Sequence, residues 1–184
     1  MTPIRGTLAF GSILLLLWAT SGCEEIADYF SSISFIDVSA QRTKLINGVE
    51  SYQSIEEARR MFPVWEVVEQ SSLGPKDNRP PFSIYKVSIK RYSHLGIWGE
   101  LHLEFFNNRL METWFYPGSF DKYVDLLEKK EGLGLKEERD GLRGTIVSPY
   151  THIWIYKDYK GRNYVAWEDT RLRREQRIWI KRYS

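Results

Sequence analysis

The stretch LHLEFFNNRLMETWFY, residues 101–116, decides the fold, because it alternates in polarity on both sides of an Asn-Asn pair. In its first run Leu101, Leu103 and Phe105 fall on one side of an extended chain, and polar residues fall on the other. Such alternation is typical of a strand with one buried face, and Asn-Asn is a turn signal. Similar short runs fill most of the chain. The sequence therefore predicts an antiparallel sheet.

Two segments replace the alternation with helical spacing. Residues 54–62, SIEEARRMF, open with a capping box formed by Ser54 and Glu57 and end before a proline. Residues 119–130, SFDKYVDLLEKK, carry apolar side chains on one face, an acid in the first turn, lysines in the last turn and Gly132 as a stop. Together with the strands they predict the α+β class, with an antiparallel sheet and two helices on one face.

The two predicted helices also resemble each other, since SIEEARRMF aligns on SFDKYVDLL without a gap. Downstream, LEFFNNRL (103–110) aligns on VAWEDTRL (165–172), and each has a polar turn before Arg-Leu. These matches predict internal repeats, 54–118 and 119–184, within a single domain at 54–184. Chance similarity between short segments is the alternative.

The strands also predict a second sheet face on which aromatic and charged side chains mix. Alternation in METWFY (111–116), HIWIYK (152–157) and RIWIKRY (177–183) assigns five aromatic residues to this face: Trp114, Tyr116, Trp154, Tyr156 and Trp179. Aromatic side chains are enriched at protein interfaces, so we expect the face to bind a partner. The alternative is that residues 24–53, which are apolar enough to pack, cover it.

The N-terminus has the order of a secretory signal peptide at residues 1–22. Arg5 is followed by an apolar block too short to cross a bilayer, and then by small residues before Cys23. Small residues before a cysteine resemble the lipobox of bacterial lipoproteins, in which the cysteine is acylated and becomes the first residue after cleavage. Thr20 departs from that motif, which usually has leucine there. An ordinary signal peptide or an uncleaved anchor is the alternative.

The lipobox resemblance implies a protein anchored in a membrane of the cell envelope by lipid on Cys23, with residues 23–53 as the lipidated N-terminus and tether. Cys23 is the chain's single cysteine, so no disulfide can form within the chain, and acylation would cap the thiol. Glu24 resembles the default outer-membrane sorting pattern. In a two-membrane bacterium this implies the periplasmic face of the outer membrane.

Replacing Cys23 with alanine should abolish labelling by a clickable fatty acid and leave unprocessed precursor, because the acylated thiol is then absent. Gel fluorescence and precursor size in labelled cells measure both effects. Equal labelling of the Cys23→Ala chain would contradict the lipoprotein assignment.

The mature chain is basic only at its end. Residues 157–184 contain nine Lys and Arg against four Asp and Glu. A basic segment can bind nucleic acid or anionic lipid, but export argues against nucleic acid. We therefore interpret Arg173, Arg174 and Arg177 as charges that protect an edge strand from unwanted pairing.

Catalytic and metal-binding patterns are weak. Ser83 and Lys86 have the Ser-x-x-Lys spacing of penicillin-binding enzymes, but they lie in a predicted strand and point to opposite faces. His102 and Glu104 share a strand face, and His152 begins another strand, yet no paired-histidine zinc spacing is present. We expect no catalytic residue, no metal and no cofactor. A hydrolase or a metal-binding protein is the weaker alternative.

The predicted element order over residues 54–184 resembles the tandem helix-plus-sheet repeats of the beta-lactamase inhibitory proteins. It is also similar to the small SmpA/OmlA lipoproteins of outer-membrane assembly. The resemblance implies a non-enzymatic protein-binding or adaptor module that uses an open sheet face. A glycan or peptidoglycan binder is the alternative, because tryptophan and tyrosine also stack on sugar rings.

Overall fold

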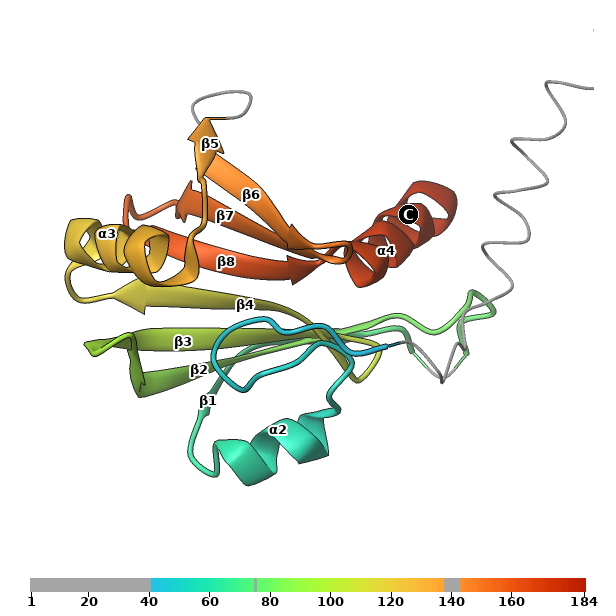
Figure 1. The fold of residues 1–184 in the computed structure, drawn as a ribbon. Coiled ribbons are helices and arrows are strands. Elements are labelled where there is room, and N and C mark those ends of the chain that lie inside the picture. The colour runs from blue at the N-terminus through green and yellow to red at the C-terminus, as the bar shows by residue number, and fades with distance from the viewer. Residues whose placement is uncertain (1–40, 75, 138–142) are drawn as a thin grey trace, which may run out of the picture. The chain divides into compact units, whose positions relative to one another are not determined.

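The computed structural model describes residues 41–184, apart from residue 75 and residues 138–142. The described residues contain three helices and eight strands, and Figure 1 shows their arrangement. In chain order these are α2 (Ile55–Met61), β1 (Glu66–Ser72), β2 (Ser83–His94), β3 (Ile97–Phe106), β4 (Arg109–Pro117), α3 (Phe120–Glu131), β5 (Lys136–Glu137), β6 (Arg143–Ser148), β7 (Thr151–Lys157), β8 (Asn163–Asp169) and α4 (Thr170–Tyr183). The predicted signal peptide at 1–22, Cys23 and residues 24–40 lie outside the described residues.

The strands form one antiparallel sheet in the order β1-β2-β3-β4-β8-β7-β6-β5. Its centre is the pairing of β4 with β8, which runs from Glu112 opposite Glu168 to Phe115 opposite Val165. β8 is the last strand in the sequence, yet it lies between β4 and β7. The predicted α+β class with an antiparallel sheet is confirmed.

The quoted stretch forms a hairpin of β3 and β4 around the predicted Asn-Asn turn. Asn107 and Asn108 connect the strands with φ angles of 49° and 60°, a left-handed conformation that asparagine tolerates better than most residues. The Asn107 side-chain oxygen also accepts a hydrogen bond of 2.7 Å from the Ser83 backbone N–H, which ties the turn to the start of β2.

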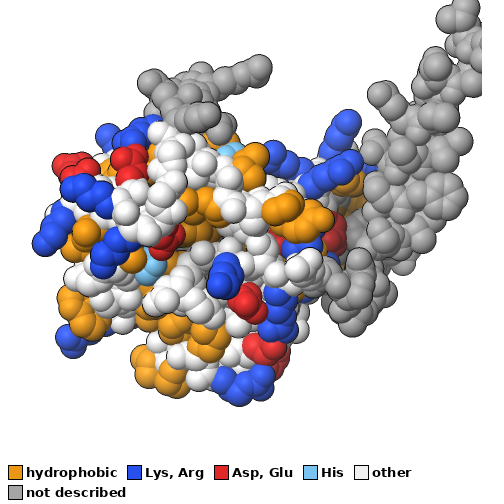
Figure 2. Space-filling model, in the orientation of Figure 1, with side chains coloured by type: hydrophobic (Ala, Val, Ile, Leu, Met, Phe, Trp, Pro, Cys, Tyr) orange, Lys and Arg blue, Asp and Glu red, His pale blue; other side chains and the backbone are white. Residues whose placement is uncertain are grey.

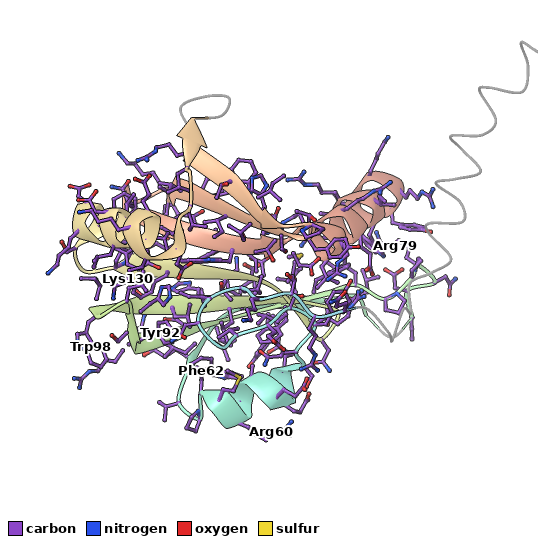
Figure 3. All side chains as sticks on the ribbon, in the orientation of Figure 1. Arg60, Phe62, Arg79, Tyr92, Trp98 and Lys130 are labelled. Carbon is purple, nitrogen blue, oxygen red and sulfur yellow. The ribbon has the colours of Figure 1, made fainter. Side chains whose placement is uncertain are left out.

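Helices α2 and α3 cover the aliphatic face of the sheet, as predicted. Leu101, Leu103 and Phe105 of β3 are fully buried there, together with Tyr123 and Leu127 of α3. The expected capping box starts α2. Figure 3 shows Phe62, which ends this helix, and Tyr92 of β2 on the same side, with ring centroids 6.0 Å apart.

The element order gives each half of the domain a helix followed by four strands. The aligned helices, α2 and α3, begin these halves. The second alignment is not equivalent, because LEFFNNRL covers the end of β3 and the start of β4, whereas VAWEDTRL covers the end of β8 and the start of α4. The alignment therefore matches the third strand of the first half with the fourth strand of the second half. Internal duplication stays a prediction.

The C-terminal segment is a helix, so the predicted strand at residues 177–183 is wrong. The side chain of Asp169 accepts hydrogen bonds from two backbone N–H groups of the first turn and thereby caps α4. Leu172, Gln176 and Trp179 are buried, and their spacing of four and three residues defines a helical face. The Ile-Trp-Ile alternation indicated a strand, but this run is too short to distinguish the periodicity of a strand from that of a helix.

Helix α4 packs on the sheet face opposite to α2 and α3. Leu172 joins a small buried cluster with Ile84, Phe106 and Met111. Ile84 and Phe106 are directly paired across β2 and β3. Each lies two residues along its strand from a residue of the aromatic and charged face, and side chains two residues apart point to the same face of a sheet. α4 therefore covers one end of that face, whereas α3 lies toward the other end of the sheet (Figure 1).

The described part of the segment expected as a cover, residues 41–53, contributes to the core. Leu45, Ile46 and Val49 are buried in the cluster beneath α2 and α3. Tyr52 instead packs beside the small cluster under α4. The rest of that segment lies outside the described residues, so the alternative that it covers the aromatic residues stays open.

Acid should destabilise the fold through one buried histidine, His94. Its Nδ1 lies 2.6 Å from the Tyr123 hydroxyl, its Nε2 lies 3.7 Å from a Glu131 carboxylate oxygen, and the rings of Phe115 and Trp167 pack against it. Burial lowers the pKa of His94 from 6.5 to about 4. As the pH falls from 6.5 to about 4, the unfolded chain therefore binds a proton at His94 that the folded chain does not bind. This difference stabilises the unfolded chain relative to the folded one.

We expect acidification from pH 7 to pH 4 to lower the free energy of unfolding by about 2 to 3 kcal/mol through His94. Urea unfolding at both pH values, on the natural chain and on His94→Asn, measures this contribution. The variant should lose less stability on acidification, even if it is less stable at pH 7. An equal acid-induced loss in both chains would contradict the assignment.

Candidate functional site

The predicted aromatic residues of β4 and β7 gather on the sheet face opposite to α2 and α3. With a further ring from β8 they form the aromatic sheet face, defined here as Trp114, Tyr116, Trp154, Tyr156 and Tyr164. The Tyr164 ring centroid lies 5.6 Å from that of Trp114, 5.0 Å from that of Tyr116 and 5.6 Å from that of Tyr156. All five side chains are partly exposed.

Sequence reasoning missed Tyr164, although the signal was present. The run NYVAWED alternates, and it buries Val165 and Trp167 in the core beneath α3. Tyr164 therefore had to point to the opposite face.

The register of the strands makes room for the two indole rings. Trp114 and Trp154 are both paired with Ala166, which lies between them on β8 and has a small side chain. On the other side of Trp154 is Gly144 of β6, where a Cβ atom would lie 2.8 Å from the indole ring. The Trp154 ring therefore lies on the backbone of β6, in a position that requires glycine beneath it.

Trp179 does not belong to this face, and its assignment there is wrong. It projects from α4, is only 3 % exposed, and donates a hydrogen bond of 3.0 Å from Nε1 to the Pro80 carbonyl oxygen. Its ring centroid lies 4.3 Å from that of Phe82. Arg79 also contacts α4 by donating to the carbonyl oxygen of Tyr183 (Figure 3). Trp179 thus attaches α4 to the segment that precedes β2.

Cations lie over two of the aromatic rings. The Lys86 ammonium is 4.3 Å from the centroid of Trp114, and the Arg162 guanidinium is 4.4 Å from the centroid of Tyr116. These distances suit cation–π attraction. The aromatic sheet face is therefore bordered by one cation from β2 and by another from the turn between β7 and β8.

A row of three carboxylates crosses the same face beside α4. Glu104, Glu112 and Glu168 are paired across β3, β4 and β8, and each is less than a tenth exposed. Arg173 of α4 hydrogen-bonds Glu112 and donates from Nε to Glu168 at 2.7 Å. Lys86 Nζ lies 3.2 Å from Glu104. The prediction that Arg173 protects a sheet edge is wrong, because it is the partly buried counter-ion of this row.

The pKa shifts in the row follow from its burial. Burial raises the pKa of Glu112 above its ordinary value, while the nearby guanidinium of Arg173 opposes the rise. Burial lowers the pKa of Arg173, but the carboxylates outweigh this effect and raise the pKa above its ordinary value. Glu112 is the carboxylate with the largest effect. Each carboxylate is thus held by a cation, and the arrangement is that of a structural ion-pair network.

The two histidines of the weak metal hypothesis lie on different strands of this face. His102 Nε2 lies 2.8 Å from a Glu100 carboxylate oxygen, and burial lowers the pKa of His102. His152, on β7, contacts Trp154 with ring centroids 3.6 Å apart and ring planes inclined by 41°. Within the described residues, no group of three His, Cys, Asp or Glu side chains is placed to hold a metal ion.

Two adjoining hollows lie between α4 and the aromatic sheet face. One, of about 330 Å³, is lined by residues that include His152, Trp154, Arg174 and Lys181. The other, of about 270 Å³, is lined by residues that include Trp114, Tyr156 and Tyr164. Both are also lined by Glu168, Arg173 and Arg177, so we treat them as one groove, the α4 groove. Figure 2 shows basic side chains at the surface over α4.

No family model matches this chain. Neither the curated proteins nor the solved structures that were compared with it contain a match. The resemblances to the beta-lactamase inhibitory proteins and to the SmpA/OmlA lipoproteins therefore stay predictions. In the part of the chain that the structure describes, no helix combines the length and the apolar composition needed to span a bilayer.

Proposed function

We propose that this chain is a lipid-anchored protein of the cell envelope that binds another protein through the aromatic sheet face. The observation that carries the proposal is the gathering of five partly exposed aromatic rings on the sheet face opposite to α2 and α3. Contiguous exposed aromatic surface is characteristic of interaction sites. The lipid anchor rests on the sequence around Cys23 alone.

The state of the rings supports a protein interface. They contact one another and the strands below, so little side-chain freedom remains to be lost on binding. Such rigid aromatic side chains supply most of the binding energy at many interfaces. Charges border the rings on both sides, from Arg162 on one side and from α4 on the other.

The carboxylates of the face support a non-enzymatic role. General acid and base catalysis needs groups that can reach a substrate and exchange protons with it. Glu112 and Glu168 line the α4 groove, but these two and Glu104 are each less than a tenth exposed and are engaged by Arg173 or Lys86. These carboxylates hold α4 against the sheet, so they have a structural role.

A glycan is the less favoured ligand, for a geometric reason. Sugar rings stack on open aromatic faces, whereas here Lys86 lies over Trp114 and Arg162 lies over Tyr116. The neighbouring rings of Trp154 and Tyr156 are inclined by 44° to each other and form no flat platform.

Site-specific photo-cross-linking tests the proposal without removing an aromatic ring. We expect p-benzoylphenylalanine at Tyr156 to cross-link the full chain to a protein partner in intact envelopes. The matched control is the same replacement at Tyr159, which is 91 % exposed and lies in the turn between β7 and β8. A partner band from Tyr156 and not from Tyr159, read by mass spectrometry, supports the proposal.

Two results would contradict it. A cross-link from Tyr156 to residues 24–40 of the same chain would show that this segment covers the face. Retention of the chain on purified peptidoglycan, with no protein cross-link from Tyr156, would favour the glycan alternative.

A further inference from the structure

The α4 groove has a charge pattern that the aromatic residues alone do not explain. Its floor is provided by the sheet, with Trp154 in one hollow and Tyr156 in the other. Its wall is provided by α4, which carries six Lys and Arg and one Glu between Thr170 and Tyr183. The groove is therefore aromatic on one side and basic on the other.

The innermost charges of the groove are already compensated. Arg173 is bound by Glu112 and Glu168, and Gln176 accepts a further hydrogen bond of 2.6 Å from it. A ligand would have to break these contacts to use Arg173, so this residue has a structural role.

The outer cations of the groove remain available. Arg174, Arg177 and Lys181 line the larger hollow, are exposed, and form no ion pair among the residues that the structure describes. Successive members are three and four residues apart, so they follow one side of the helix over about 10 Å. The larger hollow is lined by four cations and one carboxylate, Glu168, which makes it strongly electropositive.

We propose that the α4 groove binds an acidic stretch of the partner protein in an extended conformation. Its carboxylates pair with Arg174, Arg177 and Lys181, and its apolar side chains lie against Trp154. This inference rests on the proposed function, because it names the chemistry of the partner at one end of the same face.

The spacing of the cations favours a peptide chain. Residues on one side of an extended strand repeat every 6.6 Å or so. Arg177 and Lys181 are four residues apart on α4, which corresponds to a rise of about 6 Å. An extended segment with acids at alternate positions can therefore meet both cations, while the intervening side chains face the aromatic floor.

Fluorescence anisotropy with two synthetic peptides tests the inference on the full chain in detergent. The first probe is a labelled peptide of alternating Glu and Leu, and the second is the same peptide with Lys in place of Glu. We expect the acidic probe to bind more tightly than the basic one. Its affinity should fall as salt is raised, because exposed charges are screened.

The decisive variant is Arg177→Glu, and the matched control is Lys160→Glu. Both replace an exposed cation by an anion, but Lys160 lies in the β7–β8 turn and does not line the groove. We expect Arg177→Glu to weaken binding of the acidic probe about tenfold, since an attraction becomes a repulsion at the contact. Lys160→Glu should change it by less than about twofold at moderate salt, where distant charges are screened. Thermal unfolding confirms that both variants are folded.

The outcomes separate this inference from the proposed function. Equal binding of the two probes, or equal loss in the two variants, would overturn the acidic-segment assignment. A partner cross-link from Tyr156 that persists unchanged in Arg177→Glu would also overturn the acidic-segment assignment, but it would leave the proposed function in place. Displacement of the acidic probe by soluble peptidoglycan fragments, with no partner cross-link, would overturn both.

Discussion

Replacing Arg173 with methionine should lower the free energy of unfolding by about 3 to 5 kcal/mol, the range observed when one partner of a buried ion pair is removed. Methionine fills much of the same space but leaves Glu112 and Glu168 buried without a counter-ion. Urea unfolding at pH 7 measures the loss. The deficit should shrink toward pH 5, because burial raises the pKa of Glu112 and, without Arg173, nothing opposes the binding of a proton to this carboxylate in the folded chain.

The matched control is Arg174→Met, one residue further along α4. Arg174 is exposed and has no ion pair among the described residues, so its replacement should change stability by less than about 0.5 kcal/mol. Similar effects at the two positions would show that Arg173 is not the counter-ion of the carboxylate row.

Replacing Leu127 with alanine should cost about 2 to 5 kcal/mol, because it removes buried methyl groups and leaves a cavity under α3. Leu127 is fully buried against the aliphatic face of the sheet. Denaturant unfolding of the variant measures the cost. Phe120, at the start of the same helix, is only partly buried, and its replacement by alanine should cost less.

Asp125→Ala provides the control within α3. Asp125 is exposed on the opposite side of the helix from Leu127, so the change should alter stability by less than about 0.5 kcal/mol. If Leu127→Ala cost no more than this control, the packing of α3 on the sheet would be contradicted.

The sequence predicts well those elements whose pattern is local and long enough to be read. The capping box at Ser54 and the apolar spacing from Tyr123 to Leu127 locate α2 and α3, because each carries its own start and stop signals. The alternation in β3, β4 and β7 predicts which side chains face the core beneath α2 and α3. Four of the five expected aromatic residues therefore share one face.

The sequence predicts α4 and its contacts poorly, because opposing local signals occur there. Asp169 is a good N-cap, and Leu172, Gln176 and Trp179 have helical spacing, but one member of that buried face is polar and the Ile-Trp-Ile run alternates. The carboxylate row depends on strand register and on Arg173, which follows the last strand. Periodicity contains no information on which residues face each other across strands that are distant in the sequence.

The position of β8 affects how the protein can assemble. A chain that is synthesised, or exported as proposed above, becomes available for folding from one end to the other. Strands β1 to β4 can pair as they emerge, but β4 then presents an open edge, and unpaired edges attract other chains. Only β8, arriving just before α4, fills the gap between β4 and β7. The two halves of the domain are therefore joined late, and until then the edge of β4 is open to pairing with another chain.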